Sequence, residues 1–470
     1  MAHEPTGTVT TESTRRWRDR KRYLWLIGLI VPSFAFVAIG GYELTGWSAF
    51  LWTGPIVVLV LVPAIDFLTG FDPTNPPNDV IEELENDKYY RYITFAFLPI
   101  QYAGFILSMY LIATAGWPVI DKIGLALTLG FIGGIGINTA HELGHKKESH
   151  ERWLSKIALA QSFYGHFYIE HNRGHHVRVA TPEDPASSRL GENLYRFWIR
   201  TVTGSLRSAW EIEAKRYRRK DTHPFHLGND VLNAWLMTVV LWGALLIWLG
   251  VGILPYLVLQ AIIGFSLLEI VNYLEHYGML RQKTDSGRYE RVLPLHSWNS
   301  NNIATNVLLY HLQRHSDHHA NPTRRYQTLR DYKESPALPT GYSGMIVLAL
   351  FPPLWRRVMD KRVSAHFDGD IRLANVAPGK MDRLLRRFPA PATESGPAAV
   401  TDVSRRPVED GVRAARCPGC DYVYDVAEGN ELEGFAAGTA WRDIPDDWCC
   451  PDCGVREKVD FVPLTTTSGR

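Results

Sequence analysis

Cysteine, a ligand suited to soft metals, occurs only near the end of this 470-residue chain. Two CxxC motifs, Cys417 with Cys420 and Cys450 with Cys453, contain four of the five cysteines, and Cys449 is the fifth. Four thiolates on two tight turns form a tetrahedral metal cage, which suits either iron or structural zinc. Because metal-binding thiols must stay reduced, the pattern favours a cytosolic position for this segment.

Histidine clusters form a second group of candidate metal ligands upstream. Residues four apart share one helix face, so each HxxxH pair should converge, with His176 and His318 extending two of these faces. Nine imidazoles at one membrane depth are costly unless they bind something, and neutral imidazole suits iron, zinc and copper. They are enough for two metal ions. The nine are His141 and His145; His171, His175 and His176; the isolated His276; and His315, His318 and His319.

The first cluster on its own predicts a different enzyme. His141, Glu142 and His145 match the HExxH motif of zinc metalloproteases, in which Glu142 would be the general base. Intramembrane zinc proteases carry this motif on a membrane helix. Such a protease needs few further ligands and no electron carrier, so the remaining histidines and the thiolate cage argue against it.

Apolar residues make up 46% of the chain and are concentrated in stretches long enough to cross a bilayer, which takes about 20 residues each. The basic lead before the first stretch, 15–22, should face the cytoplasm, and an even number of spans puts the histidine clusters on the same side. The glycines of 130–136 lack GxGxxG spacing and instead indicate close helix packing. The predicted spans are 23–39, 49–68, 92–115, 120–139, 232–251 and 253–273.

The C-terminal segment, 416–461, resembles rubredoxin. The resemblance rests on the CxxC, YxYD, GTxW and DIPDDWxCPxCG patterns and on the final Lys458 and Phe461. Asp421 stands where glycine is usual after the first motif, and Asp tolerates a left-handed backbone. Cys449 is expected not to bind metal, the alternative being an exchange of register with Cys450. The resemblance implies one iron, cycling between ferric and ferrous forms, held by Cys417, Cys420, Cys450 and Cys453.

The histidine motifs resemble those of the integral-membrane alkane monooxygenases, a histidine-box di-iron family whose three-box design is shared with membrane desaturases and xylene monooxygenases. The strings LQRHSDHHA at 312–320 and NYLEHYG at 272–278 favour the alkane hydroxylase branch. Together with the tail, the chain resembles a natural fusion of such an enzyme with rubredoxin. The resemblance implies that the nine clustered histidines ligate two irons. It also implies terminal hydroxylation of linear alkanes to 1-alkanols with O2 and two electrons from the tethered rubredoxin.

The expected fold is an all-α six-helix transmembrane bundle with a cytoplasmic helical histidine-box region and a small rubredoxin-like metal-knuckle domain. The expected location is a bacterial inner membrane, with the N-terminus, histidine boxes and rubredoxin domain in the cytoplasm. The sequence has no flavin or nicotinamide fingerprint, so a separate flavin-dependent NAD(P)H rubredoxin reductase must supply electrons. No nucleic-acid partner is expected. The predicted segments are a disordered basic lead 1–22, a membrane di-iron domain 23–376, a flexible linker 377–413, a rubredoxin domain 414–465 and a tail 466–470.

Other residues are predicted by position alone. Carboxylates beside the boxes are candidates to orient ligand imidazoles, although solvation or salt bridges would explain them equally well. The group comprises Glu142, Glu170, Glu275 and Asp317, together with Glu269, which lies deep in the sixth span and is expected to be functional. Ile137 and Leu268, near His141 and His276, are candidate substrate contacts. The basic run 215–220 suits either an acidic rubredoxin domain or anionic lipid.

Three alternatives stay open at this stage. The first is a histidine-box desaturase, or a hydroxylase of another substrate, which product analysis would distinguish. The second is an intramembrane zinc metalloprotease with a zinc ribbon, which metal analysis would distinguish. The third is a non-catalytic metal sensor, which would have no need of a tethered one-electron carrier.

Overall fold

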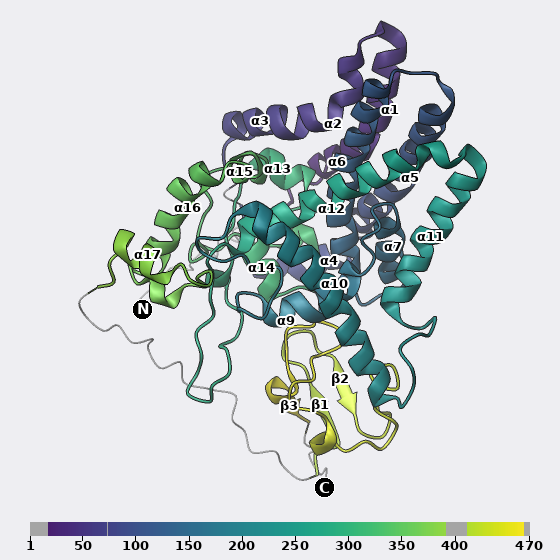
Figure 1. Cartoon of the computed structure of the whole chain (residues 1–470). Coiled ribbons are helices and arrows are strands. Elements are labelled where there is room, and N and C mark those ends of the chain that lie inside the picture. Colours follow the sequence, from purple (N-terminus) through teal and green to yellow (C-terminus); the bar gives the residue numbers. More distant parts are fainter. Residues whose placement is uncertain (1–16, 73, 392–410, 465–470) are drawn as a thin grey trace, which may run out of the picture.

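Helices build the N-terminal part of the chain in this computed structural model, which describes residues 17–72, 74–391 and 411–464 (Figure 1). Within lipid a backbone must satisfy its own hydrogen bonds, and a helix does so within one segment. Six helical segments are long and apolar enough to cross a membrane, which confirms the predicted number. They are Leu24–Thr45, Ser48–Thr69, Lys88–Thr114, Val119–Gly144, Asp230–Leu249 and Val251–His276.

Two of the membrane helices begin at a side chain that caps the first turn. The Asp87 carboxylate accepts a hydrogen bond from the Tyr89 amide at the start of α5, and Asn229 caps α11 in the same way. Val57–Leu61, within the second span, is a π-helix. The regular α-helices of the six spans are α1 (Ile30–Thr45), α2 (Thr53–Ile56), α3 (Val62–Thr69), α5 (Lys88–Thr114), α6 (Val119–Gly144), α11 (Asp230–Leu249) and α12 (Leu254–His276).

Close packing of α6 against α12 forms the centre of the bundle. A Cβ atom at Gly134 would lie 2.9 Å from the carbonyl oxygen of Gly264, so only glycine allows this approach. A Cβ atom at Gly130 would lie 2.6 Å from the Cβ of Ile263. These contacts confirm that the glycines of 130–136 serve helix packing. The two helices carry His141 and His276 at adjacent ends, so their packing fixes part of the histidine centre.

Shorter helices and loops gather at one end of the bundle around α9 and α14 (Figure 1). Part of the predicted lead packs here, because Lys21 contacts Asp72 and lies 2.7 Å from His311. Part of the predicted linker 377–413 is also folded, as α17 with Leu384 buried, whereas 392–410 lie outside the described residues. The helices are α4 (Ile81–Asn86), α7 (Ser149–Ala160), α8 (Phe167–Ile169), α9 (His176–Arg178), α10 (Leu194–Arg219), α13 (Ile303–Leu308), α14 (His315–Ala320), α15 (Tyr342–Ala349), α16 (Pro352–His366) and α17 (Met381–Arg387).

The C-terminal domain is a small sheet with two metal-binding knuckles. Strands β1 (Ala414–Arg416), β2 (Val423–Asp425) and β3 (Val462–Pro463) pair antiparallel in the order β2-β1-β3. Tyr424, Trp441 and Trp448 belong to its buried aromatic core. The domain lies against the end of α10 and beside α9 (Figure 1).

Candidate metal centres

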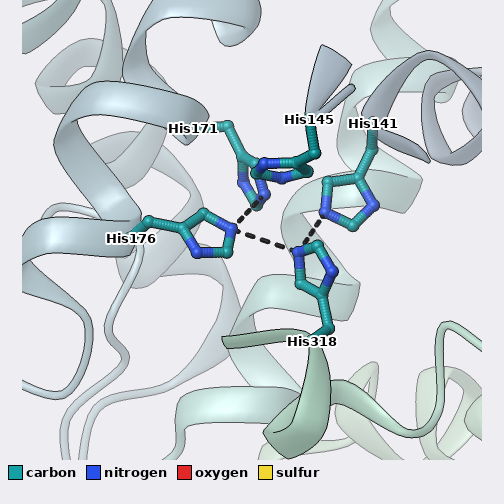
Figure 2. Close-up of side chains that lie close together, drawn as sticks. All are labelled: His141, His145, His171, His176 and His318. Atoms are coloured by element: carbon teal, nitrogen blue, oxygen red, sulfur yellow. Dashed lines mark hydrogen bonds between the residues drawn. The ribbon is translucent and has the colours of Figure 1, made fainter. Parts of the chain in front are cut away.

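The nine predicted histidine ligands meet in two buried groups. Within each group, one nitrogen of every ring lies within 4.8 Å of the others. Figure 2 shows the five rings of the first group turned toward a common centre. The five are His141, His145, His171, His176 and His318, and the second group is His175, His276, His315 and His319.

The second histidine cluster contributes to both groups. Helical spacing predicts that His171 and His175 converge, yet they belong to different groups. The reason is local: Glu170–His175 form a π-helix, whose wider turn aligns residues five apart. The Nε2 atoms of His171 and His176 are therefore 3.0 Å apart. His175 faces the other group, with its ring centroid 4.8 Å from that of His276.

The ring nitrogens are arranged as metal ligands. His318 Nε2 lies 2.8 Å from the Nε2 of His141 and 3.1 Å from that of His176. The Nε2 of His145, buried beside them, has no hydrogen-bond partner among the residues that the structure describes. Two facing ring nitrogens share at most one proton, so this set fits a cation better than a hydrogen-bond network. Burial, helped by neighbouring histidines, lowers the pKa values of His145, His171, His176, His315, His318 and His319 well below the usual range. These imidazoles are therefore held in the neutral form that binds metal.

In the described part of the chain two carboxylates contact ligand imidazoles, and one of them was not predicted. Asp184 Oδ2 lies 2.9 Å from His175 Nδ1 and accepts a hydrogen bond of 2.6 Å from Ser187. Burial alone would raise the pKa of Asp184, but His175 and Ser187 hold that pKa below its usual range. Glu275, which was predicted, has its Oε2 3.2 Å from His315 Nε2. Asp184 follows the second box by a short loop, so only the folded chain shows its partner.

The other predicted carboxylates bond to groups outside the ligand set. Glu142, Glu170, Glu269 and Asp317 are all buried, and in the described residues none makes a hydrogen bond to a ligand histidine. Their partners, in the same order, are Lys146 at 2.9 Å, Arg178 at 3.0 Å, Tyr164 at 2.7 Å with Thr201 and Asn272, and Arg324 at 3.0 Å. These contacts tie the box helices to the surrounding scaffold.

An apolar cavity lies between the membrane helices. Its lining comes from α1, α3, α6, α12, α13 and α15, with part of the π-helix of the second span. Leu268, a predicted substrate contact, lines it, whereas Ile137 is buried in packing and is not among the lining residues. Asn138, one helical turn before His141, is one of its few polar residues. A cavity of this lining suits a hydrocarbon chain.

The four predicted cysteines of the tail form the third metal group. Their sulfur atoms lie within 4.8 Å of one another, with 3.5 Å between the Sγ atoms of Cys420 and Cys450. Cys449 is outside the cage, and its Sγ lies 3.7 Å from the carbonyl oxygen of Asp447. Asp421 has φ +62°, the left-handed conformation expected where glycine is usual.

The basic run at the end of α10 contacts the acidic C-terminal domain. Lys215 Nζ lies 2.7 Å from Asp447, and Arg219 lies 3.2 Å from Glu433. Of the two predicted partners for this run, the structure therefore brings the rubredoxin-like domain to it.

A transmembrane helix bundle with clustered histidines at one end is typical of a class of membrane oxidoreductases. Comparison with known proteins places this chain in the same class. Residues 115–349 match the Fatty acid desaturase family, and residues 414–461 match Rubredoxin. The chain is 47% identical to "Alkane 1-monooxygenase" of Acinetobacter baylyi, over 81% of this chain and 94% of that protein. It is 43% identical to "Alkane 1-monooxygenase" of Pseudomonas putida, over 80% and 94%. A more distant relative is the "Xylene/toluene monooxygenase hydroxylase component XylM" of Pseudomonas putida, at 30% identity over 51% of this chain and 63% of that protein.

The chain belongs to the alkane 1-monooxygenase family and carries a rubredoxin domain at its C-terminal end. It is an integral membrane enzyme of the oxygenase class. The histidine-box family implies a di-iron site, and the cysteine cage of the rubredoxin domain implies one further iron.

Proposed function

We propose that this chain hydroxylates the terminal methyl group of linear alkanes, using O2 and electrons from its own rubredoxin domain. The observation that carries the proposal is that one chain combines two buried histidine groups, a docked thiolate cage and an apolar cavity, whose lining includes Asn138, one helical turn before His141. The overall reaction converts alkane, O2, two electrons and two protons into 1-alkanol and water. Bound at the histidine groups, two irons would supply the activation of O2.

The side chains would divide the work as follows. The five-histidine and four-histidine groups would each hold one iron, and Asp184 would keep His175 in position through its Nδ1 atom. Glu275 contacts His315 at Nε2, the nitrogen that faces His276 and His319, so it lies on the metal side of that ring. Leu268 and the other cavity residues bind the hydrocarbon, orient its end toward the histidines and exclude water. We propose the domain limits given by the sequence, with the folded part continuing through α17 to residue 391.

Two features of the cellular setting complete the proposal. The rubredoxin domain accepts electrons from a separate flavin-dependent NAD(P)H reductase, because the sequence has no flavin or nicotinamide fingerprint. The N-terminus, histidine groups and rubredoxin domain face the cytoplasm of a bacterial inner membrane, which the basic lead and the reduced thiols support. Protease added to inverted vesicles should remove the C-terminal domain, and protease added to spheroplasts should not.

The decisive experiment is product analysis with labelled oxygen. The purified chain in lipid nanodiscs receives a rubredoxin reductase, NADH, ¹⁸O2 and a series of linear alkanes, and products are identified by gas chromatography and mass spectrometry. The expected product is a 1-alkanol with one ¹⁸O atom, and a His318→Ala variant should form none. An alkene would favour the desaturase alternative, and an alcohol without ¹⁸O would contradict oxygen insertion from O2. Zinc at the histidine groups would favour the protease.

A further inference from the structure

The loop after the second cysteine knuckle lies directly on the second histidine box. Gly454, next to Cys453, has φ +68°, and a Cβ atom there would collide with the carbonyl oxygen of Asn172. That Cβ would also lie 4.0 Å from the Cβ of His176. Asn172 directly follows His171, so the contact is flanked by two members of the five-histidine group. Glycine is the residue that allows this approach.

The first cysteine knuckle makes a second contact with the same end of the bundle. Lys147 Nζ donates a hydrogen bond of 2.6 Å to the carbonyl oxygen of Cys420. Lys147 lies two residues beyond His145, another member of the five-histidine group. Both knuckles of the cage therefore contact the end of the bundle that carries the five-histidine group.

A buried ion pair holds the rubredoxin domain in this position. Glu433 is 4% exposed and lies 2.7 Å from Arg173 and 3.2 Å from Arg219. Arg219 Nε also donates to the Glu433 carbonyl oxygen at 2.8 Å. Arg173 belongs to the π-helix of the second box, so that one short segment carries iron ligands on its inner side and a docking residue on its outer side.

More exposed pairs surround this buried pair. Their positive members belong to the hydroxylase and their negative members to the rubredoxin domain, which is the complementarity of a specific docking surface. Exposed ion pairs contribute little stability, so the buried Glu433 should dominate. The exposed pairs are Lys215 with Asp447, Arg288 with Glu457 and Arg291 with Asp460.

We propose that the second histidine box is also the docking site of the tethered rubredoxin domain, with the Gly454–Asn172 contact as the point where electrons cross. The proposal rests on the function proposed above. Each crossing oxidises the rubredoxin iron from ferrous to ferric and delivers one electron to the hydroxylase domain. Two crossings supply the two electrons that one O2 consumes, and the reductase returns the rubredoxin iron to the ferrous form after each.

Cys449 provides a measure of docking that needs no turnover. It lines the cleft between the two domains together with Arg173, Lys215 and Arg219. It is also the one cysteine of the sequence outside the cage. Its rate of alkylation by a maleimide should therefore report how often the rubredoxin domain leaves its docking site.

The first test is Gly454→Ala, with Gly438→Ala as the matched control. Gly438 lies in the same domain at φ +88°, but a Cβ atom there meets nothing within 4 Å. Both variants carry left-handed strain, and only the first creates a collision. Gly454→Ala should accelerate Cys449 alkylation about tenfold or more, since overpacking of a tight contact has costs of that order. It should slow oxidation of the pre-reduced rubredoxin domain to a similar extent. Gly438→Ala should match the parent chain in both, and the rubredoxin absorption band verifies that each cage is intact.

The second test replaces the buried anion. Glu433→Gln should accelerate alkylation about tenfold or more, because truncating one partner of a buried charge pair leaves the arginines unpaired. Glu431→Gln removes the same charge from an exposed position of the same loop and should have no effect. Equal alkylation rates in Gly454→Ala, Glu433→Gln and the parent would overturn the docking site. Faster alkylation with unchanged electron transfer would overturn the crossing point. If the alkylation rates were as expected but neither the parent chain nor any variant oxidised alkanes, the proposed function would be rejected and the docking site would stand.

Discussion

Removal of Asp184 should weaken iron binding at the histidine groups without unfolding the chain. Its carboxylate is buried, holds His175 Nδ1 at 2.9 Å and is itself fixed by Ser187 and the Ala186 amide. Without it, the imidazole of His175 loses the partner that fixes its tautomer and orientation. Loss of such a partner costs about 10–100-fold in metal affinity. That range corresponds to about 1.4–2.7 kcal/mol.

Iron retention under chelator measures this effect directly. Asp184→Ala and the parent chain are equilibrated with graded chelator, and total iron is determined by mass spectrometry. The visible absorption of the rubredoxin domain gives its iron separately, so the difference is the histidine-bound iron. We expect the chelator concentration at half-loss of that iron to fall about 10–100-fold in Asp184→Ala, with the rubredoxin iron unchanged.

Glu183→Ala is the matched control for this prediction. Glu183 is the preceding residue, carries the same charge and is exposed. It should leave the chelator midpoint within about twofold of the parent value, since surface substitutions have small effects. If Asp184→Ala kept its histidine-bound iron as firmly as Glu183→Ala, the orienting role of Asp184 would be refuted.

Three further predictions concern the cavity, the scaffold and the docking surface. Leu268→Phe narrows the cavity and should shift the preferred alkane toward shorter chains, with about 10-fold discrimination per methylene. Ile262→Phe, on the exposed face of α12, should leave the preferred chain length unchanged. Gas chromatography of the products from a mixture of alkanes measures this preference. Glu269→Gln leaves Tyr164 or Thr201 without its acceptor and should cost about 1–3 kcal/mol of stability, seen as a lower unfolding temperature with normal iron content. An unchanged unfolding temperature would contradict the scaffold role of Glu269. Added salt should accelerate Cys449 alkylation by screening the exposed interdomain pairs, and a salt-independent rate would show that those pairs do not support docking.

Residue type and spacing were sufficient to select the histidines that the structure brings together and to locate the membrane helices. Runs of about 20 apolar residues and nine clustered histidines are local patterns, and the structure gathers all nine. Their division into five and four was not predictable from helical spacing, because the π-helix at Glu170–His175 separates His171 from His175. Short-range sequence carries no clear signal for such a turn.

Tertiary contacts were harder to predict than ligands. Adjacency to a box selected Glu142 and Asp317, which bond to Lys146 and Arg324 instead of to histidines. The carboxylate that holds His175 comes from the loop at Asp184. The partner of a buried imidazole is the residue that the folded chain places next to the ring, which need not be close to it in sequence. The residues that line the cavity were hard to predict for the same reason. Of the two predicted substrate contacts, Leu268 lines the cavity and Ile137 is not among its lining residues.

Mössbauer spectroscopy of the intact chain grown on ⁵⁷Fe tests the central claim most directly. The two histidine groups and the single cysteine cage predict two nitrogen-ligated irons for each sulfur-ligated iron. Reduction through the rubredoxin domain should change both kinds of signal. Iron confined to the cysteine cage, or zinc in either histidine group, would contradict a di-iron oxygenase that is reduced by its own rubredoxin domain.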